Sequence, residues 1–248
     1  MPGEPPLKPG ADAALRPLPA PRRAGIEAAL ALAVEIPAAL LVAVEIVVLF
    51  AGVIARFVLH TPLIWSDELS SILFLWLAML GSVIAFQRGE HMRMTALVGK
   101  AAPAARAFLD VVAVAAPLLF LLLIGWPAFE YAIEEAAITT PALGLPNIWR
   151  AAALPVGIAL MAAFALLRLG REGELRRVLA ALALVLAVAA VFWLGAPLFR
   201  GLGNLNLILF FVIGVAVCVC AGVPIAFAFG RATFGYLALT TSTPLIVM

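Results

Sequence analysis

Residues 65–91 read WSDELSSILFLWLAMLGSVIAFQRGEH and contain the pattern that decides the fold. Residues 69–86 carry no charge, and these 18 residues match the roughly 30 Å core of a bilayer at about 1.5 Å of helix rise per residue. Acidic residues precede the run and basic residues follow it, as a helix dipole favours. Because basic residues prefer the cytoplasmic side, we predict a membrane helix that runs from outside to inside.

The composition of the whole 248-residue chain indicates a membrane protein. It is 65% hydrophobic and 12% charged, with a mean hydropathy of +1.16, whereas soluble domains are about 45 to 50% apolar and about 25% charged. The net charge is only +2, and the basic residues are spread over separate short loops, which argues against a nucleic-acid partner. We therefore predict an all-α, polytopic membrane helical bundle whose main surroundings are lipids.

Five further apolar segments of about the length of a bilayer crossing bring the predicted total to about six transmembrane helices. Their approximate bounds are residues 28–55, 109–129, 148–167, 178–199 and 205–229. The basic residues divide 13 to 3 between the two sides, which places the N-terminus in the cytoplasm. Residues 1–25 are rich in Pro, Ala and Gly and predict a disordered cytoplasmic tail.

Two acidic residues, Glu35 and Glu45, fall inside the first predicted span. A carboxylate at that depth costs at least a few kcal/mol unless it is paired or faces water. Ten positions on a helix leave the two side chains about 80° apart, so both could face one neighbouring helix. One interpretation is a proton or cation pathway. The other places Glu35 near the inner surface and Glu45 in a hydrogen bond within the bundle.

The sequence predicts neither a metal site nor an enzyme. His60 and His91 are the only histidines, and the predicted topology puts them on opposite membrane surfaces, too far apart to share a metal ion or a haem. His91 lies near Arg88, where a solvated cluster close to anionic lipid headgroups is expected. We find no nucleophile and base pair, no metal-ligand spacing and no Gly-rich phosphate loop.

The outer end of the first two spans carries charged and aromatic residues. Arg56 is expected to pair with Asp67 or Glu68 across a short loop, and an exposed pair of this kind contributes only about 0 to 1 kcal/mol. Trp65 lies at the outer edge of its span, a position typical of the aromatic belt at a membrane interface.

Two backbone features concern how helices pack. Small residues recur on one face of the second span, which lets another helix approach closely. These residues are Ser71, Ala78, Ser82 and Ala85. Pro224 removes one helical hydrogen bond and, with Gly222 beside it, predicts a kink in the last span.

Several residue groups then occur in an order, spacing and topology that point to one family. They are Arg56-Phe57 after the first span, Trp65-Ser66-Asp67-Glu68 at the start of the second, Phe74-Leu75-Trp76-Leu77 and Gly81 within it, and Arg88 followed by His91-Met92. Over about residues 26–170 the chain resembles the small, Q-type (DctQ-like) membrane subunit of tripartite ATP-independent periplasmic (TRAP) transporters. These residues are therefore candidates for structural or partner-interface roles.

The C-terminal part carries a second resemblance. Gly222-Val223-Pro224-Ile225-Ala226-Phe227 is similar to the end of the first span of the large, M-type (DctM-like) subunit. The two resemblances imply a four-helix Q-type domain at 26–170, a connecting transmembrane helix at 171–203 and the start of an M-type domain at 204–248. Because the final apolar run has no closing basic residue, we expect a fragment or the front part of a larger permease.

The family resemblance implies sodium-driven uptake of an organic acid, usually a carboxylate, across the bacterial inner membrane. A periplasmic binding protein would deliver the solute, and the M-type part would hold the substrate and sodium sites. The Q-type part would be a scaffold with no cofactor of its own. Two alternatives stay open: a membrane-anchor or assembly subunit without transport, and a self-contained proton-coupled carrier that uses Glu35 and Glu45.

Overall fold

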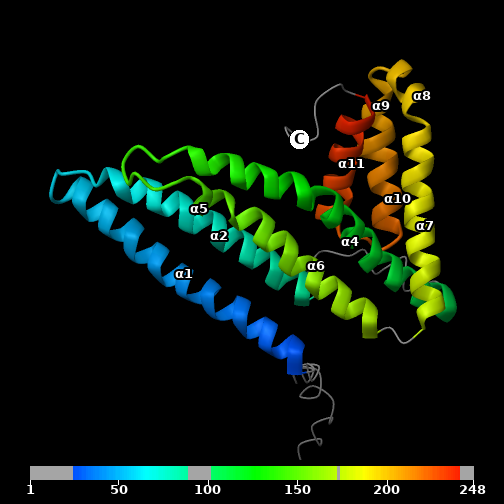
Figure 1. Cartoon of the computed structure of the whole chain (residues 1–248), viewed down its shortest axis with the longest axis horizontal. Helices are drawn as coiled ribbons and strands as arrows, with labels where there is room; N and C mark the ends of the chain where they lie inside the picture. The colour runs from blue at the N-terminus through cyan, green and yellow to red at the C-terminus, as the bar shows by residue number, and fades with distance from the viewer. Residues whose placement is uncertain (1–24, 89–101, 172–173, 241–248) are drawn as a thin grey trace, which may run out of the picture.

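The computed structural model describes residues 25–88, 102–171 and 174–240 (Figure 1). The predicted N-terminal tail, except for its last residue, and His91 lie outside these ranges. The described residues form helices and one isolated β-bridge, and five helices are long and apolar enough to cross a membrane. The prediction of an all-α, polytopic membrane helical bundle is confirmed.

The first two helices, α1 (Gly25–Phe57) and α2 (Ile64–Arg88), form an antiparallel pair joined by a short loop (Figure 1). α1 packs mainly against α2, through a buried stripe that includes Val34, Ala38 and Val48. The helices approach closely near the loop, where a Cβ added to Gly52 would lie 3.1 Å from Ser66 Oγ. Small side chains thus permit tight packing at the outer end of the pair.

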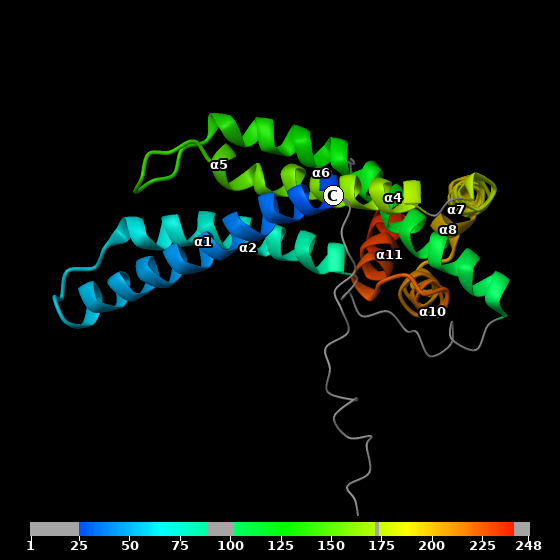
Figure 2. The ribbon, with the colours of Figure 1, turned by 90° about the horizontal axis from the view of Figure 1, so that it is seen from below.

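A second antiparallel pair consists of α4 (Pro103–Glu134) and α6 (Ala153–Arg171). Figure 2 shows this pair as a layer that lies on the layer of α1 and α2. The layers are in close contact where α2 meets α6, because a Cβ added to Gly157 would lie 3.1 Å from Met79 Cβ and would overlap the end of the Met79 side chain. Most of the buried core lies between these four helices.

The segment predicted to connect the two domains forms α7 (Leu175–Leu194), which packs against α4. Four short helices follow, and the last three are continuous along the chain. They are α8 (Ala196–Gly201), α9 (Leu205–Leu207), the π-helix η2 (Ile208–Gly214) and α10 (Val215–Cys220). α11 (Ile225–Thr240) then returns beside η2 and α10 (Figure 1).

The prediction of a single kinked span at 205–229 is wrong, because the chain stops one helix and starts another. Gly222 has a φ of +84°, a left-handed conformation, and the N–H of Val223 donates to the carbonyl oxygen of Cys218 at 3.0 Å. This geometry is a Schellman motif, which ends a helix. Pro224 then directly precedes α11. The result is a hairpin of two apolar helices, each shorter than the five long ones.

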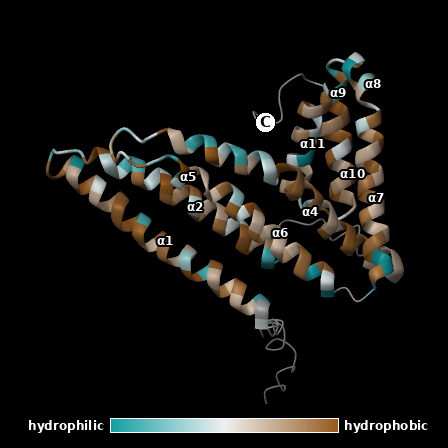
Figure 3. Cartoon of the chain, viewed as in Figure 1, coloured by the Kyte–Doolittle hydropathy of each residue, from teal (hydrophilic) through white to brown (hydrophobic). Residues whose placement is uncertain are grey.

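Hydrophobic side chains cover the outside of the bundle as well as its core. Figure 3 shows hydrophobic residues along the length of most helices and hydrophilic residues mainly near helix ends and in loops. Leu40 and Val47 of α1 are 61% and 66% exposed. An apolar outer surface of this kind is what a lipid environment requires.

Candidate functional site at the ends of the helices

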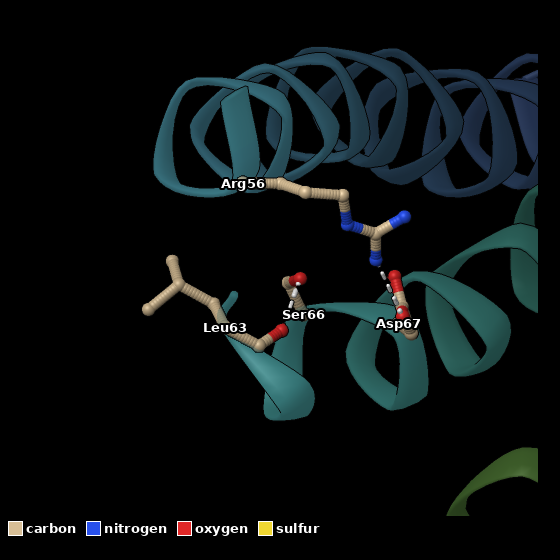
Figure 4. A network of polar contacts seen from close by, with 4 residues as sticks. All are labelled: Arg56, Leu63, Ser66 and Asp67. Atoms are coloured by element: carbon tan, nitrogen blue, oxygen red, sulfur yellow. Dashed lines mark hydrogen bonds and ion pairs between the residues drawn. The ribbon is translucent and has the colours of Figure 1, made fainter. Parts of the chain in front are cut away.

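At the outer end of the first helix pair, Arg56 of α1 pairs with Asp67 of α2 (Figure 4). Arg56 Nη2 lies 3.3 Å from Asp67 Oδ2, and the two side chains are 56% and 72% exposed. Next to the pair, the Ser66 hydroxyl donates to the carbonyl oxygen of Leu63 at 2.7 Å and fixes the first turn of α2. Because water screens an exposed ion pair, this one orients the helix ends more than it stabilises them.

Glu68, the other acid expected near Arg56, instead holds a distant loop. Glu68 Oε1 accepts a hydrogen bond from the N–H of Ala142 at 2.7 Å, and Oε2 accepts one from the N–H of Leu143 at 2.9 Å. These residues are 74 and 75 positions away in the sequence. No local sequence pattern predicted this contact. It attaches the loop between η1 (Glu135–Ala137) and α5 (Ile148–Ala151) to the start of α2.

The same loop has internal hydrogen bonds that fix its shape. Gly144 has a φ of +65°, and the N–H of Thr140 donates to the carbonyl oxygen of Leu145 at 2.8 Å. The Asn147 side-chain amide donates to the Glu135 carboxylate, and Asn147 is buried. The turn expected from the Pro- and Gly-rich sequence is therefore present and closely folded on itself.

We expect removal of the Glu68 carboxylate to release this loop. Glu68→Ala deletes two hydrogen bonds to a charged acceptor, so the amides of Ala142 and Leu143 should exchange with solvent about tenfold faster or more. Hydrogen exchange over residues 138–147, measured by mass spectrometry, provides the readout. Asp67→Ala is the matched control and should leave exchange in the loop unchanged. Equal exchange in Glu68→Ala and the wild type would contradict this role of Glu68.

The loop and α2 line an open cleft of about 430 Å³ at the outer end. Its lining carries acidic, basic and hydroxyl groups, so it suits polar recognition. The lining residues are Asp67, Glu68, Ser71 and Ile72 of α2, Ile138, Thr139, Thr140, Pro141 and Asn147 of the loop, and Arg150 of α5.

Tryptophans connect and border this outer end. The indole N–H of Trp76 in α2 donates to the carbonyl oxygen of Trp149 in α5 at 2.7 Å. Trp65 lies in the first turn of α2 and is 39% exposed. Trp126 donates to Glu130 within α4 at 2.7 Å. Amphipathic rings at these positions fit the expected interfacial belt, and Trp76 also ties α2 to the outer loop.

One face of α2 is left open by the rest of the described chain. Ser71, Phe74, Ala78 and Gly81 are all exposed, and a Cβ added to Gly81 would meet nothing within 4 Å. Three of these four residues are small. Gly81 therefore differs from Gly157, which already lies against a neighbouring helix. The face has the properties that let a further membrane helix pack closely.

At the inner end, Glu35 of α1 pairs with Arg88, the last residue of α2. Glu35 Oε1 lies 3.3 Å from Arg88 Nη2. A second pair there joins Glu27 of α1 to Arg171 of α6. Glu35 is thus part of an interhelical ion pair at the end of the helix pair that the charge pattern predicts to be cytoplasmic, whereas His91, expected close to Arg88, lies outside the described residues.

Glu45 lies on the buried face of α1, ten positions from Glu35. It is 8% exposed, and its Oε2 atom has no hydrogen-bond partner among the described residues. This oxygen therefore accepts no hydrogen bond from the described part of the bundle, where one was expected for Glu45. No described contact links Glu45 to the Glu35 and Arg88 pair, so the structure gives no support to a relay between the two glutamates.

Replacing Glu45 with leucine should stabilise the chain. A carboxyl group inside a membrane helix costs about 2.5 to 3.5 kcal/mol near its centre, and leucine removes that cost at similar volume. We expect Glu45→Leu to raise the midpoint of thermal unfolding in detergent, measured by circular dichroism, by an amount equivalent to about 2 kcal/mol. Glu45→Gln retains a buried polar group and should give a smaller gain. A lower midpoint for Glu45→Leu would show that the carboxyl group has a stabilising partner.

Metal chemistry has no visible site in the part of the chain that the structure covers. No group of three or more His, Cys, Asp or Glu side chains there could hold an ion. The two ends of the bundle contain ion pairs and an attached loop, and one face of α2 is open between them.

Comparison with known proteins connects this arrangement to a family. Residues 45–174 match the family model described as the DctQ component of tripartite ATP-independent periplasmic transporters. The chain belongs to the DctQ family. The match covers just over half of the chain and includes α2, α4, α6 and the outer loop, together with the part of α1 that contains Arg56.

Three relatives illustrate the DctQ similarity. A TRAP transporter small permease protein of Haemophilus influenzae is 31% identical over 118 residues, which cover 46% of this chain and 71% of the relative. The sialic acid TRAP transporter small permease protein SiaQ of Vibrio cholerae is 30% identical over 105 residues, 41% of this chain and 59% of SiaQ. The sialic acid TRAP transporter permease protein SiaT of Haemophilus influenzae is 33% identical over 116 residues, 46% of this chain but only 18% of SiaT.

Proposed function

We propose that this chain is the scaffold part of a sodium-coupled TRAP transporter that imports an organic acid across the bacterial inner membrane. The observation that carries the proposal is the DctQ match over residues 45–174, which includes the packed helices α2, α4 and α6. Two relatives belong to transporters for sialic acid, which is a carboxylate. A carboxylate substrate and a sodium gradient, with no other cofactor and no catalytic role for this chain, are parts of the same proposal.

The second part of the proposal is that residues 204–248 begin an M-type transport domain fused to the DctQ-like part. The motif at 222–227 supports it, and so does SiaT, in which the DctQ-like match occupies less than a fifth of a longer permease. α7 is long and apolar enough to cross a membrane, so it would give the extra crossing that a fusion needs between residues 26–170 and residues 204–248. The ring centroids of Phe86 in α2 and Phe227 in α11 lie 5.5 Å apart, so the C-terminal hairpin packs against the scaffold.

The open face of α2 is the proposed contact for a helix of the transport domain. Its small residues, Ser71, Ala78 and Gly81, would let two helix backbones approach closely. Phe74 on the same face is 63% exposed and would be covered in the assembly. α1 and α6 occupy other faces of α2, so this contact needs no rearrangement of the scaffold.

The outer end is the proposed landing surface for a periplasmic binding protein. The cleft beside Glu68 and Arg150 faces the side on which that protein would arrive, and it carries charges of both signs. The loop that forms one wall is held by Glu68 and Asn147. A pre-shaped polar surface suits transient docking, because little ordering is needed on binding.

Isolation of the tagged chain from its own membranes tests the assembly. We expect an N-terminal affinity tag, purified in mild detergent, to recover an M-type polypeptide, either as one continuous chain larger than 26.0 kDa or as a stoichiometric partner. The size of the tagged band distinguishes these two forms. Recovery of the chain alone, under conditions that preserve a known membrane complex from the same sample, would contradict the proposal.

A further inference from the structure

Arg231 in α11 is a basic residue inside the apolar hairpin that α10 and α11 form. It takes no part in the features of the DctQ-like scaffold described above. Its Nη2 atom lies 3.4 Å from Cys218 Sγ in α10, and a thiol is a weak hydrogen-bond acceptor. Its Nε atom is buried and has no hydrogen-bond partner among the described residues. A guanidinium in such surroundings needs an anion, because the cost of a charge in hydrocarbon is otherwise uncompensated.

The side chain of Arg231 extends toward the turn of the hairpin. Arg231 is seven positions after Pro224, whereas Cys218 is three positions before Ala221. At about 1.5 Å of rise per residue, the guanidinium therefore lies roughly 6 Å nearer the turn than the Arg231 backbone. Long basic side chains behave in this way when they reach for a membrane surface.

That turn lies at the inner end of the bundle. Phe227, close to the start of α11, packs against Phe86, and Phe86 is two positions before the end of α2. α2 ends at Arg88, which the charge pattern places at the inner surface. The guanidinium of Arg231 thus extends toward the headgroups of the inner leaflet.

Three described carboxylates at this end already have basic partners. The ion pairs are Glu27 with Arg171, Glu35 with Arg88, and Glu174 with Arg177. None of the described acidic residues pairs with Arg231. The phosphate of an anionic phospholipid is an anion at the inner surface, and a planar guanidinium can bind it through two hydrogen bonds.

We propose that Arg231 forms a binding site for the phosphate group of one anionic phospholipid of the inner leaflet. The site does not depend on the transported solute or on a binding protein. Its lipid would seal the hairpin against the neighbouring helices at the inner surface and neutralise Arg231. Cys218 would remain a weak second contact of the guanidinium.

Native mass spectrometry of the purified full chain, titrated with phosphatidylglycerol, tests this site. We expect the first phosphatidylglycerol to bind Arg231→Gln about tenfold more weakly than the wild type, because a charge-assisted hydrogen-bonded contact is lost. Arg168→Gln removes an exposed arginine of α6 and is the matched control, expected to bind within about twofold of the wild type. Phosphatidylcholine should bind the wild type more weakly than phosphatidylglycerol.

Arg231→Lys keeps the charge but loses the planar pair of donors, so it should bind with intermediate affinity; it also serves if Arg231→Gln loses helical structure. Wild-type affinity for phosphatidylglycerol in Arg231→Gln would overturn the proposal. Equal weakening in Arg168→Gln and Arg231→Gln would overturn it as well, because it would show a general effect of surface charge. No preference for phosphatidylglycerol over phosphatidylcholine would have the same meaning.

Discussion

Replacing Gly81 with leucine is expected to reduce transport strongly while this chain stays folded. A Cβ at Gly81 meets nothing within 4 Å in the described chain, so the larger side chain costs the scaffold little. In the assembled transporter the same side chain would keep the proposed partner helix away from α2. Uptake of the organic acid by cells that carry Gly81→Leu should fall about tenfold or more, because close helix packing is lost.

Two measurements complete the Gly81 test. Gly81→Ala adds one methyl group and should retain most of the uptake. Circular dichroism should show the same helical content and a similar unfolding midpoint for Gly81→Leu and the wild type. Normal uptake with Gly81→Leu would mean that the open face of α2 is in contact with lipid only.

Replacing Gly157 with leucine is expected to destabilise the fold of the chain itself, whereas replacing Gly81 is expected to leave the fold intact. The position is in contact with Met79 of α2, and a Cβ would approach Met79 Cβ to 3.1 Å and overlap the end of its side chain. α2 and α6 must then separate, at a cost of about 3 kcal/mol. Thermal unfolding in detergent, followed by circular dichroism, should show a clearly lower midpoint for Gly157→Leu than for Gly81→Leu. Equal midpoints for the two variants would contradict the assignment of Gly157 to a packed helix face and of Gly81 to an open one.

The fold was largely predictable because the sequence signals are local and repeated. The charge-free run at 69–86 identified α2, and long apolar segments identified the other four helices that can cross a membrane. The short loop between the first two spans predicted that Arg56 would pair with Asp67 or Glu68, and the structure has the pair with Asp67. Local patterns of this kind need no knowledge of how distant segments pack.

The sequence at the end of the last predicted span contains a signal for a helix end, which was interpreted as a kink. The prediction of a kink rested on Pro224 and its missing hydrogen bond. The structure instead depends on Gly222, whose φ of +84° ends α10 before the proline is reached. Glycine followed by proline at this spacing is the usual sign of a helix end, so the hairpin could have been predicted.

Contacts between distant segments could not be predicted. The hydrogen bonds from the outer loop to Glu68 join residues 74 and 75 positions apart, and the pair of Glu35 with Arg88 joins residues 53 positions apart. Both depend on the register of packed helices, which hydropathy does not determine. Helix periodicity indicated that Glu35 and Glu45 could both face one neighbouring helix, but it did not indicate that Glu35 would pair with Arg88.

The central claim, that this chain is an essential scaffold for sodium-driven uptake of an organic acid, is tested most directly by uptake after an in-frame deletion of residues 26–170. Radiolabelled sialic acid and a panel of other carboxylates would be supplied to the cells with and without a sodium gradient. The account predicts that sodium-dependent uptake of at least one carboxylate disappears in the deletion strain and returns with the intact chain. Unchanged sodium-dependent uptake of every carboxylate in the deletion strain would contradict it.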